Sequence, residues 1–127
     1  MAATAPGART VLLVEDDALV RMVTAGELRG AGLTVIEAAS AEEAYEAILA
    51  GLAVDVVFTD VRTEGGLDGY EFARRLRAER PRLPVILTSG HLDESVASLV
   101  APFLAKPYRI ETVIQLIQTQ LSATRAP

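Results

Sequence analysis

The sequence predicts an α/β fold, a doubly wound sheet of five parallel strands with helices on both faces. Two observations carry this prediction. Short continuous apolar runs, which suit buried parallel strands, alternate with longer stretches whose apolar residues recur at helical spacing. The chain has 127 residues, a length that suits one domain around one sizeable core. Because right-handed crossovers place each helix against the sheet, this alternation predicts a parallel sheet covered on both sides.

The first half of the chain contains three predicted strands and two predicted helices. Gly30 and Gly32 stop the first helix. Ser40 and Glu43 have the spacing of a capping box, which opens the second helix, and Gly51 closes it. The third strand is apolar throughout, so we expect it near the centre of the sheet. The expected strands are residues 10–14, 34–37 and 54–59, and the expected helices are residues 18–29 and 40–51.

The second half contains two predicted strands and three predicted helices. Asp68 and Glu71 repeat the capping-box spacing, and Pro81 ends the helix that they open. The last helix carries apolar residues along one face. The expected elements are a loop at 61–67, a helix at 68–80, a strand at 85–88, a weak fourth helix at 93–100, a strand at 103–105 and a helix at 110–121. We expect one domain over 9–123, with loose tails at 1–8 and 124–127.

Composition excludes several classes of function. The chain has no cysteine, which excludes disulfides, thiol chemistry and cysteine-ligated metals. A net charge of -5 argues against direct binding to nucleic acid, which needs a basic face. No apolar run approaches the roughly 20 residues of a membrane span, and the first residues lack the pattern of a signal peptide. We therefore expect a cytoplasmic protein that binds neither nucleic acid nor membrane.

Charged and hydroxyl side chains follow four of the five predicted strands, at the ends where ligands bind in this fold. Clustered carboxylates repel one another, and a hard divalent cation such as Mg²⁺ compensates them with oxygen ligands. An aspartate can act as a nucleophile, while a lysine and a hydroxyl stabilise the charge of a transferred phosphoryl group. The residues are Glu15, Asp16 and Asp17 after the first strand, Asp60 after the third, Thr88 and Ser89 after the fourth, and Lys106 after the fifth.

Each of these residues also has a purely structural interpretation. Asp17 is better explained as the cap of the first helix than as a metal ligand. Without the other residues, Thr88 would be an ordinary polar residue at the end of a strand, and Lys106 would be a solvated surface residue. Asp60 follows a fully apolar strand and shares its sheet edge with other acids, so function is the better interpretation there. His91 has no second histidine or cysteine with which to form a transition-metal site, and we expect it in a surface loop.

Five segments, in order, resemble the receiver domains of two-component response regulators. The similarity covers residues 10–121. Each segment is a weak signal alone, and the five together with the expected fold make a strong one. The segments are 11–17 (Val-Leu-Leu-Val-Glu-Asp-Asp), 56–60 (Val-Val-Phe-Thr-Asp), 67–71 (Leu-Asp-Gly-Tyr-Glu), 85–90 (Val-Ile-Leu-Thr-Ser-Gly) and 103–108 (Phe-Leu-Ala-Lys-Pro-Tyr).

The resemblance implies a flavodoxin-like sheet of strand order 2-1-3-4-5 and a phosphoryl-accepting switch that is not a conventional enzyme. A histidine kinase or a histidine phosphotransfer protein would phosphorylate Asp60 with Mg²⁺, for which Mn²⁺ could substitute. The switch would change the surface of the fourth helix, fifth strand and fifth helix. The implied roles are metal binding for Glu15, Asp16, Asp60 and the Arg62 backbone carbonyl, phosphoryl contact or switching for Thr88, Ser89, Lys106 and Phe103, and a cis bond before Pro107.

Three features depart from the family's usual pattern. Residues 63–66 (Thr-Glu-Gly-Gly) replace a shorter, proline-containing turn. The interval from Thr88 to Lys106 is short by roughly four residues, about one turn of helix, so we expect the fourth helix to be truncated or irregular. Glu15 stands where aspartate is commoner, a change that keeps the negative charge on a longer side chain. In the family, the fourth helix is part of the surface that contacts downstream partners. Recognition of the downstream partner is therefore the property that carries over least well from the family to this sequence.

Other functions remain as alternatives. The first is a pseudo-receiver, a protein-binding module of the same fold that does not depend on phosphorylation, although its usual substitutions are absent here. A phosphatase of the haloacid dehalogenase type would carry a second aspartate where Arg62 stands. A nucleotide- or flavin-binding domain would need a glycine-rich loop after the first strand, where acids stand instead. The downstream protein is unidentified, a homodimer is one alternative for output, and the chain could stand alone or belong to a hybrid histidine kinase.

Overall fold

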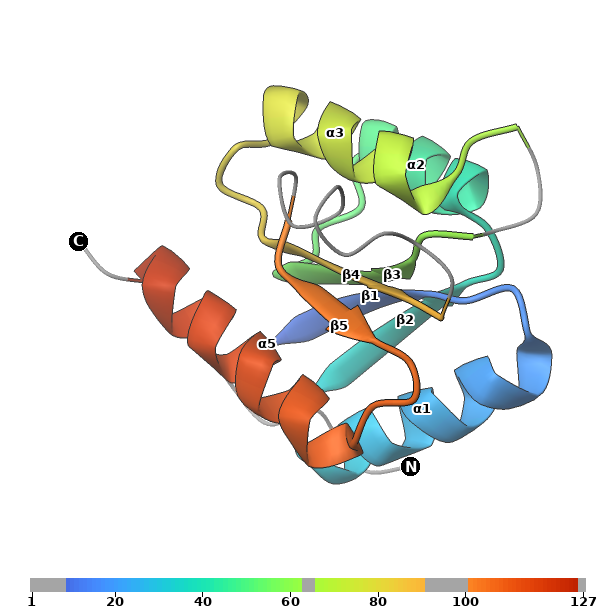
Figure 1. The fold of residues 1–127 in the computed structure, drawn as a ribbon. Coiled ribbons are helices and arrows are strands. Elements are labelled where there is room, and N and C mark those ends of the chain that lie inside the picture. The colour runs from blue at the N-terminus through green and yellow to red at the C-terminus, as the bar shows by residue number, and fades with distance from the viewer. Residues whose placement is uncertain (1–8, 63–65, 91–100, 126–127) are drawn as a thin grey trace.

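The computed structural model describes residues 9–62, 66–90 and 101–125, and these residues form the predicted sheet. Five parallel strands lie in the order β2-β1-β3-β4-β5, which is the order that the resemblance implies. The chain moves outward from β1 to β2, returns to β3 on the other side of β1, and then continues to β5 (Figure 1). The strands are β1 (Thr10–Val14), β2 (Thr34–Ala38), β3 (Val56–Asp60), β4 (Val85–Ser89) and β5 (Phe103–Ala105).

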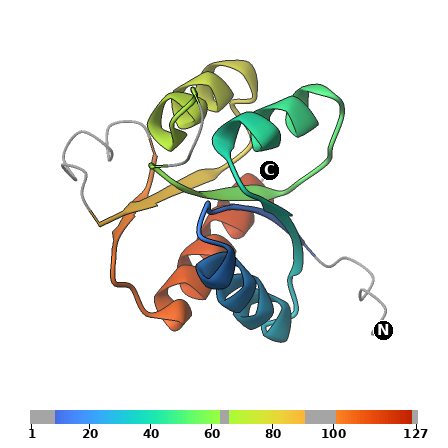
Figure 2. The ribbon, with the colours of Figure 1, turned by 90° about the vertical axis from the view of Figure 1, so that its right-hand side faces the viewer.

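Helices cover both faces of this sheet. Figure 2 shows α2 and α3 on one face and α1 with α5 on the other, so the fold has three layers. The expected fourth helix at 93–100 and the loop residues 63–65 lie outside the described residues, as does His91. No helix in the described part of the chain is long and apolar enough to cross a lipid bilayer. The helices are α1 (Ala18–Gly30), α2 (Ala41–Leu49), α3 (Gly69–Glu79) and α5 (Ile110–Arg125).

Two apolar clusters, one on each side of the sheet, hold the layers together. Leu12 and Val57 pack with Phe72 on the side of α2 and α3. Their neighbours in sequence, including Leu13 and Phe58, pack with the helices on the opposite side. Successive strand residues point to opposite faces, so a strand that is buried on both sides must be apolar throughout. This is why the strands form continuous apolar runs in the sequence.

Side-chain caps fix the start of three helices. The Asp17 carboxylate accepts hydrogen bonds from the backbone N–H groups of Leu19 and Val20, which confirms its expected capping role. The side chains of Ser40 and Asp68 each accept a hydrogen bond from the backbone N–H three residues later, as the capping-box spacing predicts. The caps at Asp17 and Asp68 begin their helices directly after the loops that follow β1 and β3, which carry candidate site residues.

Several predicted boundaries differ from the structure by a few residues. The third strand starts at Val56 instead of residue 54 and includes Asp60, while the fourth includes Ser89, because Asp60 pairs with Thr88 and Ser89 with Ala105 in the sheet. The second strand runs on to Ala38, and α1 includes Gly30. The last helix continues to Arg125, past residue 121 and into the segment expected as a tail. No glycine or proline interrupts it before Pro127.

Candidate functional site

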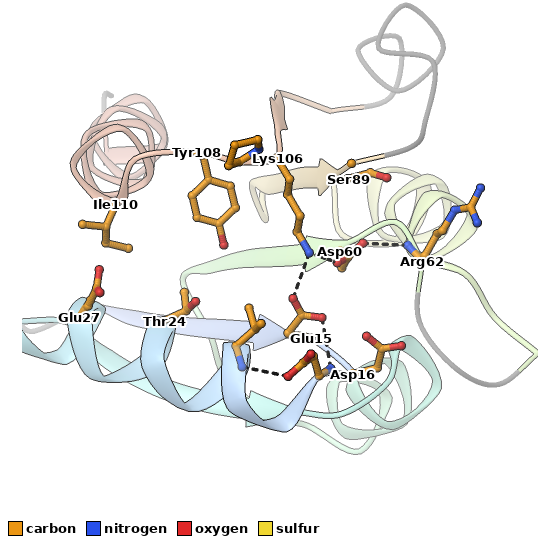
Figure 3. A pocket seen from close by; sticks show the side chains of 14 residues that line it. Glu15, Asp16, Thr24, Glu27, Asp60, Arg62, Ser89, Lys106, Tyr108 and Ile110 are labelled. Atoms are coloured by element: carbon orange, nitrogen blue, oxygen red, sulfur yellow. Dashed lines mark hydrogen bonds and ion pairs between the residues drawn. The ribbon is translucent and has the colours of Figure 1, made fainter.

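The main pocket lies at the carboxyl ends of the strands and contains most of the residues singled out in the sequence. It has a volume of about 910 Å³ and opens between the end of the sheet, α1 and the segment that joins β5 to α5 (Figure 3). Parallel strands bring their carboxyl ends to one edge, so residues far apart in the sequence meet there. The predicted site residues that line it are Glu15, Asp16, Asp60, Arg62, Ser89, Lys106 and Pro107.

Lys106 joins two of the carboxylates in this pocket. Its Nζ lies 3.1 Å from a carboxylate oxygen of Glu15 and also forms an ion pair and hydrogen bond with Asp60. Burial by itself would lower the pKa of Lys106, but the hydrogen bonds to Asp60 and Glu15 outweigh it and raise the pKa above the ordinary value. Lys106 is therefore a fixed positive charge between two acids.

Glu15 is the most buried acid of the pocket, with 5% of its surface exposed. Burial raises its pKa above the ordinary value and the charge of Asp60 adds to this, although the contact with Lys106 opposes it. Arg21 from α1 donates a hydrogen bond of 2.7 Å to the Glu15 backbone carbonyl and so holds the loop after β1 in place. The raised pKa marks Glu15 as a carboxylate that gains from a cation.

Asp60 ends the central strand, is 7% exposed, and has both carboxylate oxygens engaged. The backbone N–H of Arg62 donates to its Oδ1 at 3.0 Å, and Lys106 binds its Oδ2. The Arg62 side chain is exposed and points away from the acids (Figure 3). The loop after β3 therefore contacts Asp60 through the backbone of Arg62.

The hydroxyl residues after β4 have different surroundings. Ser89 lines the main pocket. Thr88 is 3% exposed, and its Oγ1 is buried without a hydrogen-bond partner among the residues that the structure describes. Thr88 instead lines a second, small cavity beside Glu15 and Asp60. The structure thus places both hydroxyls at the sheet edge, one facing the pocket and one behind it.

Phe103 lies away from the acids. It is half-buried, packs against the apolar cluster on the α2 and α3 side, and lines a separate surface groove with residues of α5. By contrast, the Lys106–Pro107 peptide bond is cis, the geometry that the resemblance implies. Phe103 is therefore the one predicted site residue that the structure leaves outside the pocket and its adjoining cavity.

Comparison with known proteins decides the family. The model of the response regulator receiver domain matches residues 11–118. The chain belongs to this family. The receiver domain is 33% identical over 117 residues to the transcriptional regulator NtrC of Escherichia coli K12, and 37% identical over 121 residues to the sensor kinase CckA of Brucella abortus. These alignments cover 88% and 91% of the chain.

A solved structure supports the same assignment. The receiver domain superposes on the response regulator receiver protein of Sinorhizobium medicae with a TM-score of 0.86 at 31% identity, covering 95% of this chain and all of the other. The chain spans only 24% of the length of NtrC and 13% of CckA. Receiver domains are signalling phosphoacceptors that interact with histidine kinases in two-component systems. The activities of the relatives that depend on the rest of their chains are not assigned to this receiver domain.

Receiver domains generally bind Mg²⁺, and the donor atoms of this pocket fit that ion. Glu15, Asp16 and Asp60 offer carboxylate oxygens on one wall of the pocket, and Mg²⁺ prefers oxygen ligands. Among residues 9–62, 66–90 and 101–125, no three acidic or histidine side chains are already gathered as a metal cluster. The Lys106 ammonium lies between Glu15 and Asp60 and compensates their charges.

Several pocket residues of the receiver domain were not singled out in the sequence, among them Tyr108 and Thr24. Tyr108 and Thr24 face each other across the pocket between the start of α5 and the middle of α1 (Figure 3). Tyr108 lies two residues after Lys106, so its position next to the site could have been inferred from the motif. Thr24 is seven residues into α1 and looks like one polar residue in an amphipathic helix. Only the packing of α1 against the sheet brings it to the site.

Proposed function

We propose that this receiver domain accepts a phosphoryl group on Asp60 in a Mg²⁺-dependent reaction and that phosphorylation switches the face made by the expected fourth helix, β5 and α5. In the cytoplasm, a histidine kinase or a histidine phosphotransfer protein would supply the phosphoryl group. The observation that carries the proposal is the position of Asp60. It is a buried aspartate at the end of the central strand, held by the Arg62 backbone and by Lys106.

The proposed step is a displacement at phosphorus. A carboxylate oxygen of Asp60 attacks the phosphorus atom, and the bond from phosphorus to the donor nitrogen or oxygen breaks. The leaving group departs with the bonding electrons and takes a proton from solvent. Lys106 shifts from Asp60 to a phosphoryl oxygen, so its positive charge stabilises the charge that spreads over the phosphoryl group.

A bound Mg²⁺ would supply further positive charge for the phosphoryl oxygens. Glu15, Asp16 and Asp60 are the side chains that would hold it, with the Arg62 backbone carbonyl as a further ligand. Glu15 has the strongest reason to take part, because burial raises its pKa and a cation would offset the cost of its buried charge. The Thr88 hydroxyl has no partner in the described part of the chain, and it would donate to a phosphoryl oxygen.

The metal requirement gives the direct test. With Mg²⁺ and a small phosphodonor such as acetyl phosphate, we expect the protein to gain one phosphoryl mass, and with EDTA we expect no gain. Intact-mass spectrometry measures both. Lowering the pH should raise the Mg²⁺ concentration needed for half-maximal phosphorylation, because the raised pKa of Glu15 lets a proton compete with the cation.

The sign of this pH effect follows from the protonation of Glu15. Below its folded-state pKa the carboxyl is neutral, and cation binding must release the proton, so apparent Mg²⁺ affinity falls as pH falls. Glu15→Gln should need more Mg²⁺ at neutral pH and should lose most of this pH dependence. A mass gain of equal size with Mg²⁺ and with EDTA would contradict the metal requirement.

A group of exposed apolar side chains lies on α1 beside the pocket. Leu19, Val20, Met22 and Val23 are 65%, 38%, 60% and 49% exposed, and Val20 also lines the pocket. Exposed apolar groups at the rim of a site mark a surface for another protein. A phosphohistidine donor must approach Asp60 from this open side, so we place its docking surface on α1.

We expect Met22→Glu to slow phosphotransfer from a histidine kinase by about tenfold, because a charge would enter an apolar contact. The kinase is chosen by screening a panel for phosphotransfer to the wild-type protein. Phosphorylation by acetyl phosphate should stay at the wild-type rate, because a small donor needs no docking surface.

Leu49→Glu is the matched control, since Leu49 is an exposed apolar residue on α2, with 54% of its surface accessible. It should leave both reactions unchanged. Equal slowing by the two substitutions, or none by Met22→Glu, would exclude α1 as the docking surface.

A further inference from the structure

A small cavity lies directly behind the acidic pocket. Its volume is about 10 Å³, which is close to the space that one water molecule needs. Apolar residues of β1 and β3 form part of its wall. The polar residues that line it are Glu15, Thr24, Asp60, Thr88 and Tyr108. A cavity of this size with several polar groups suits an ordered water, whereas a dry cavity would be lined by apolar side chains alone.

The Thr88 hydroxyl supplies a reason for such a water. Thr88 is 3% exposed, and its Oγ1 has no hydrogen-bond partner among residues 9–62, 66–90 and 101–125. A buried hydroxyl without a partner costs free energy, so buried polar groups are nearly always paired with protein or with ordered water. Thr88 lines the cavity, and a water there would satisfy it.

Tyr108 and Thr24 form the opposite side of the cavity. The Tyr108 ring packs edge-on against Phe58, with 5.7 Å between the ring centroids and 63° between the planes. Its hydroxyl points toward Thr24, which is 7% exposed (Figure 3). Burial raises the pKa of Tyr108, although a hydrogen bond with Thr24 opposes this, so the phenol is neutral and keeps its O–H.

We propose that this cavity binds one water molecule and that Tyr108 is a positioning residue that retains it. The water accepts the hydrogen bond of the Thr88 hydroxyl and is held by the hydroxyls of Tyr108 and Thr24 and by the Glu15 carboxylate. This inference rests on the proposed function, in which the Thr88 hydroxyl donates to a phosphoryl oxygen. A threonine hydroxyl has a single proton to donate, so the water and the phosphoryl group compete for it.

The competition predicts that Tyr108 favours the unphosphorylated state. Without the Tyr108 hydroxyl, the water is held less tightly and the Thr88 proton is more available to the phosphoryl group. We expect Tyr108→Phe to bind beryllofluoride, a phosphoryl analogue, about fivefold more tightly than the wild-type protein in the presence of Mg²⁺. Isothermal titration calorimetry measures this affinity. Thr24→Val, which removes another hydroxyl from the same cavity, should change it in the same direction.

Two further variants separate positioning from general structural effects. In a Thr88→Val background, Tyr108→Phe should no longer change the affinity, because the competing proton is gone. Tyr45→Phe should have no effect in either background. Tyr45 donates its phenol hydroxyl to Glu79 on α3, at 2.6 Å, and does not line the cavity. Urea unfolding of each variant confirms that it is folded under the titration conditions.

The outcomes distinguish the two proposals. A wild-type protein that fails to bind beryllofluoride with Mg²⁺ overturns the proposed function and this inference with it. A wild-type protein that binds, with Tyr108→Phe and Thr24→Val unchanged, overturns the inference alone. A crystal structure provides an independent readout, in which an ordered water within hydrogen-bonding distance of Thr88 Oγ1 is expected, and a dry cavity would refute the water site.

Discussion

Asp60→Asn is expected to abolish phosphorylation, so that the variant gains no mass under conditions in which the wild-type protein gains one phosphoryl group. An amide is a poor nucleophile and lacks the negative charge that pairs with Lys106. The other carboxylates that line the pocket lie after β1 or on α1, so none replaces Asp60 at the end of the central strand. Intact-mass spectrometry after incubation with acetyl phosphate and Mg²⁺ measures the result.

Asp68→Asn is the matched control. Asp68 caps α3 through a hydrogen bond of 2.7 Å from the Glu71 backbone N–H, and asparagine caps helices about as well as aspartate. This variant makes the same chemical change eight residues further along the chain, and it should be phosphorylated at the wild-type level. If Asp60→Asn still gained a phosphoryl group, peptide mapping would identify another acceptor and the role of Asp60 would be rejected.

The same assay separates a receiver from a pseudo-receiver. The two share the fold, and they differ in whether the acidic pocket performs phosphoryl chemistry. A wild-type protein that gains no mass, while remaining folded and binding its partner through α1, would support the protein-binding module. Asp60 and Lys106 are both present and form an ion pair, so neither of these two positions carries the substitution expected of a pseudo-receiver.

The fold was predictable because its strands are buried on both faces. Strands buried on both faces, such as residues 56–58, form continuous apolar runs that are easily recognised in the sequence. The glycines at 32 and 51, with φ of 91° and 105°, indicate where helices end. The last residue of each strand was harder to predict, because the backbone hydrogen bonds of the sheet continue past the apolar run into polar residues. Asp60 and Ser89 were expected just after strands and are instead their last residues.

The composition of the site was also largely predictable, since parallel strands must bring their carboxyl ends together. What the sequence could not supply is the contact made by each side chain. Lys106 lies 91 residues from Glu15 in the chain and still binds it, because β5 and β1 end at the same edge. Thr24 and the small cavity depend on how α1 packs on the sheet, and no local pattern encodes that packing. Phe103 differs from Thr24, because its position in the motif assigned it to the site, whereas its side chain packs against the apolar cluster on the α2 and α3 side.

Gly69→Ala is expected to destabilise the protein by about 3 kcal/mol, the upper range for forcing extra atoms into a packed region. Gly69 is the first residue of α3 and lies against the end of β3. A Cβ atom there would stand 2.0 Å from the Asp60 carbonyl oxygen and 2.9 Å from the Val61 Cα. Both atoms belong to the backbone, so no side-chain rotation relieves the overlap. Urea unfolding gives the free energy of unfolding and the slope that checks two-state behaviour.

Gly26→Ala provides the opposite expectation in the same experiment. Gly26 lies within α1, and no atom would stand within 4 Å of its added Cβ. Alanine is the better helix former, so this variant should gain roughly 1 kcal/mol of stability. If both variants shifted stability in the same direction, the contact at Asp60 would not be what restricts position 69.

The contact also links packing to chemistry. The Gly69 backbone N–H donates a hydrogen bond of 2.7 Å to the Val61 carbonyl, so α3 begins directly against the loop that orients Asp60. Moving that backbone would displace the Asp60 carboxylate from Lys106 and from the Arg62 N–H. Gly69→Ala should therefore slow phosphorylation by acetyl phosphate even at temperatures where it remains folded, whereas Gly26→Ala should not. The absence of a side chain at residue 69 is thus part of what holds Asp60, the proposed phosphoacceptor, in position.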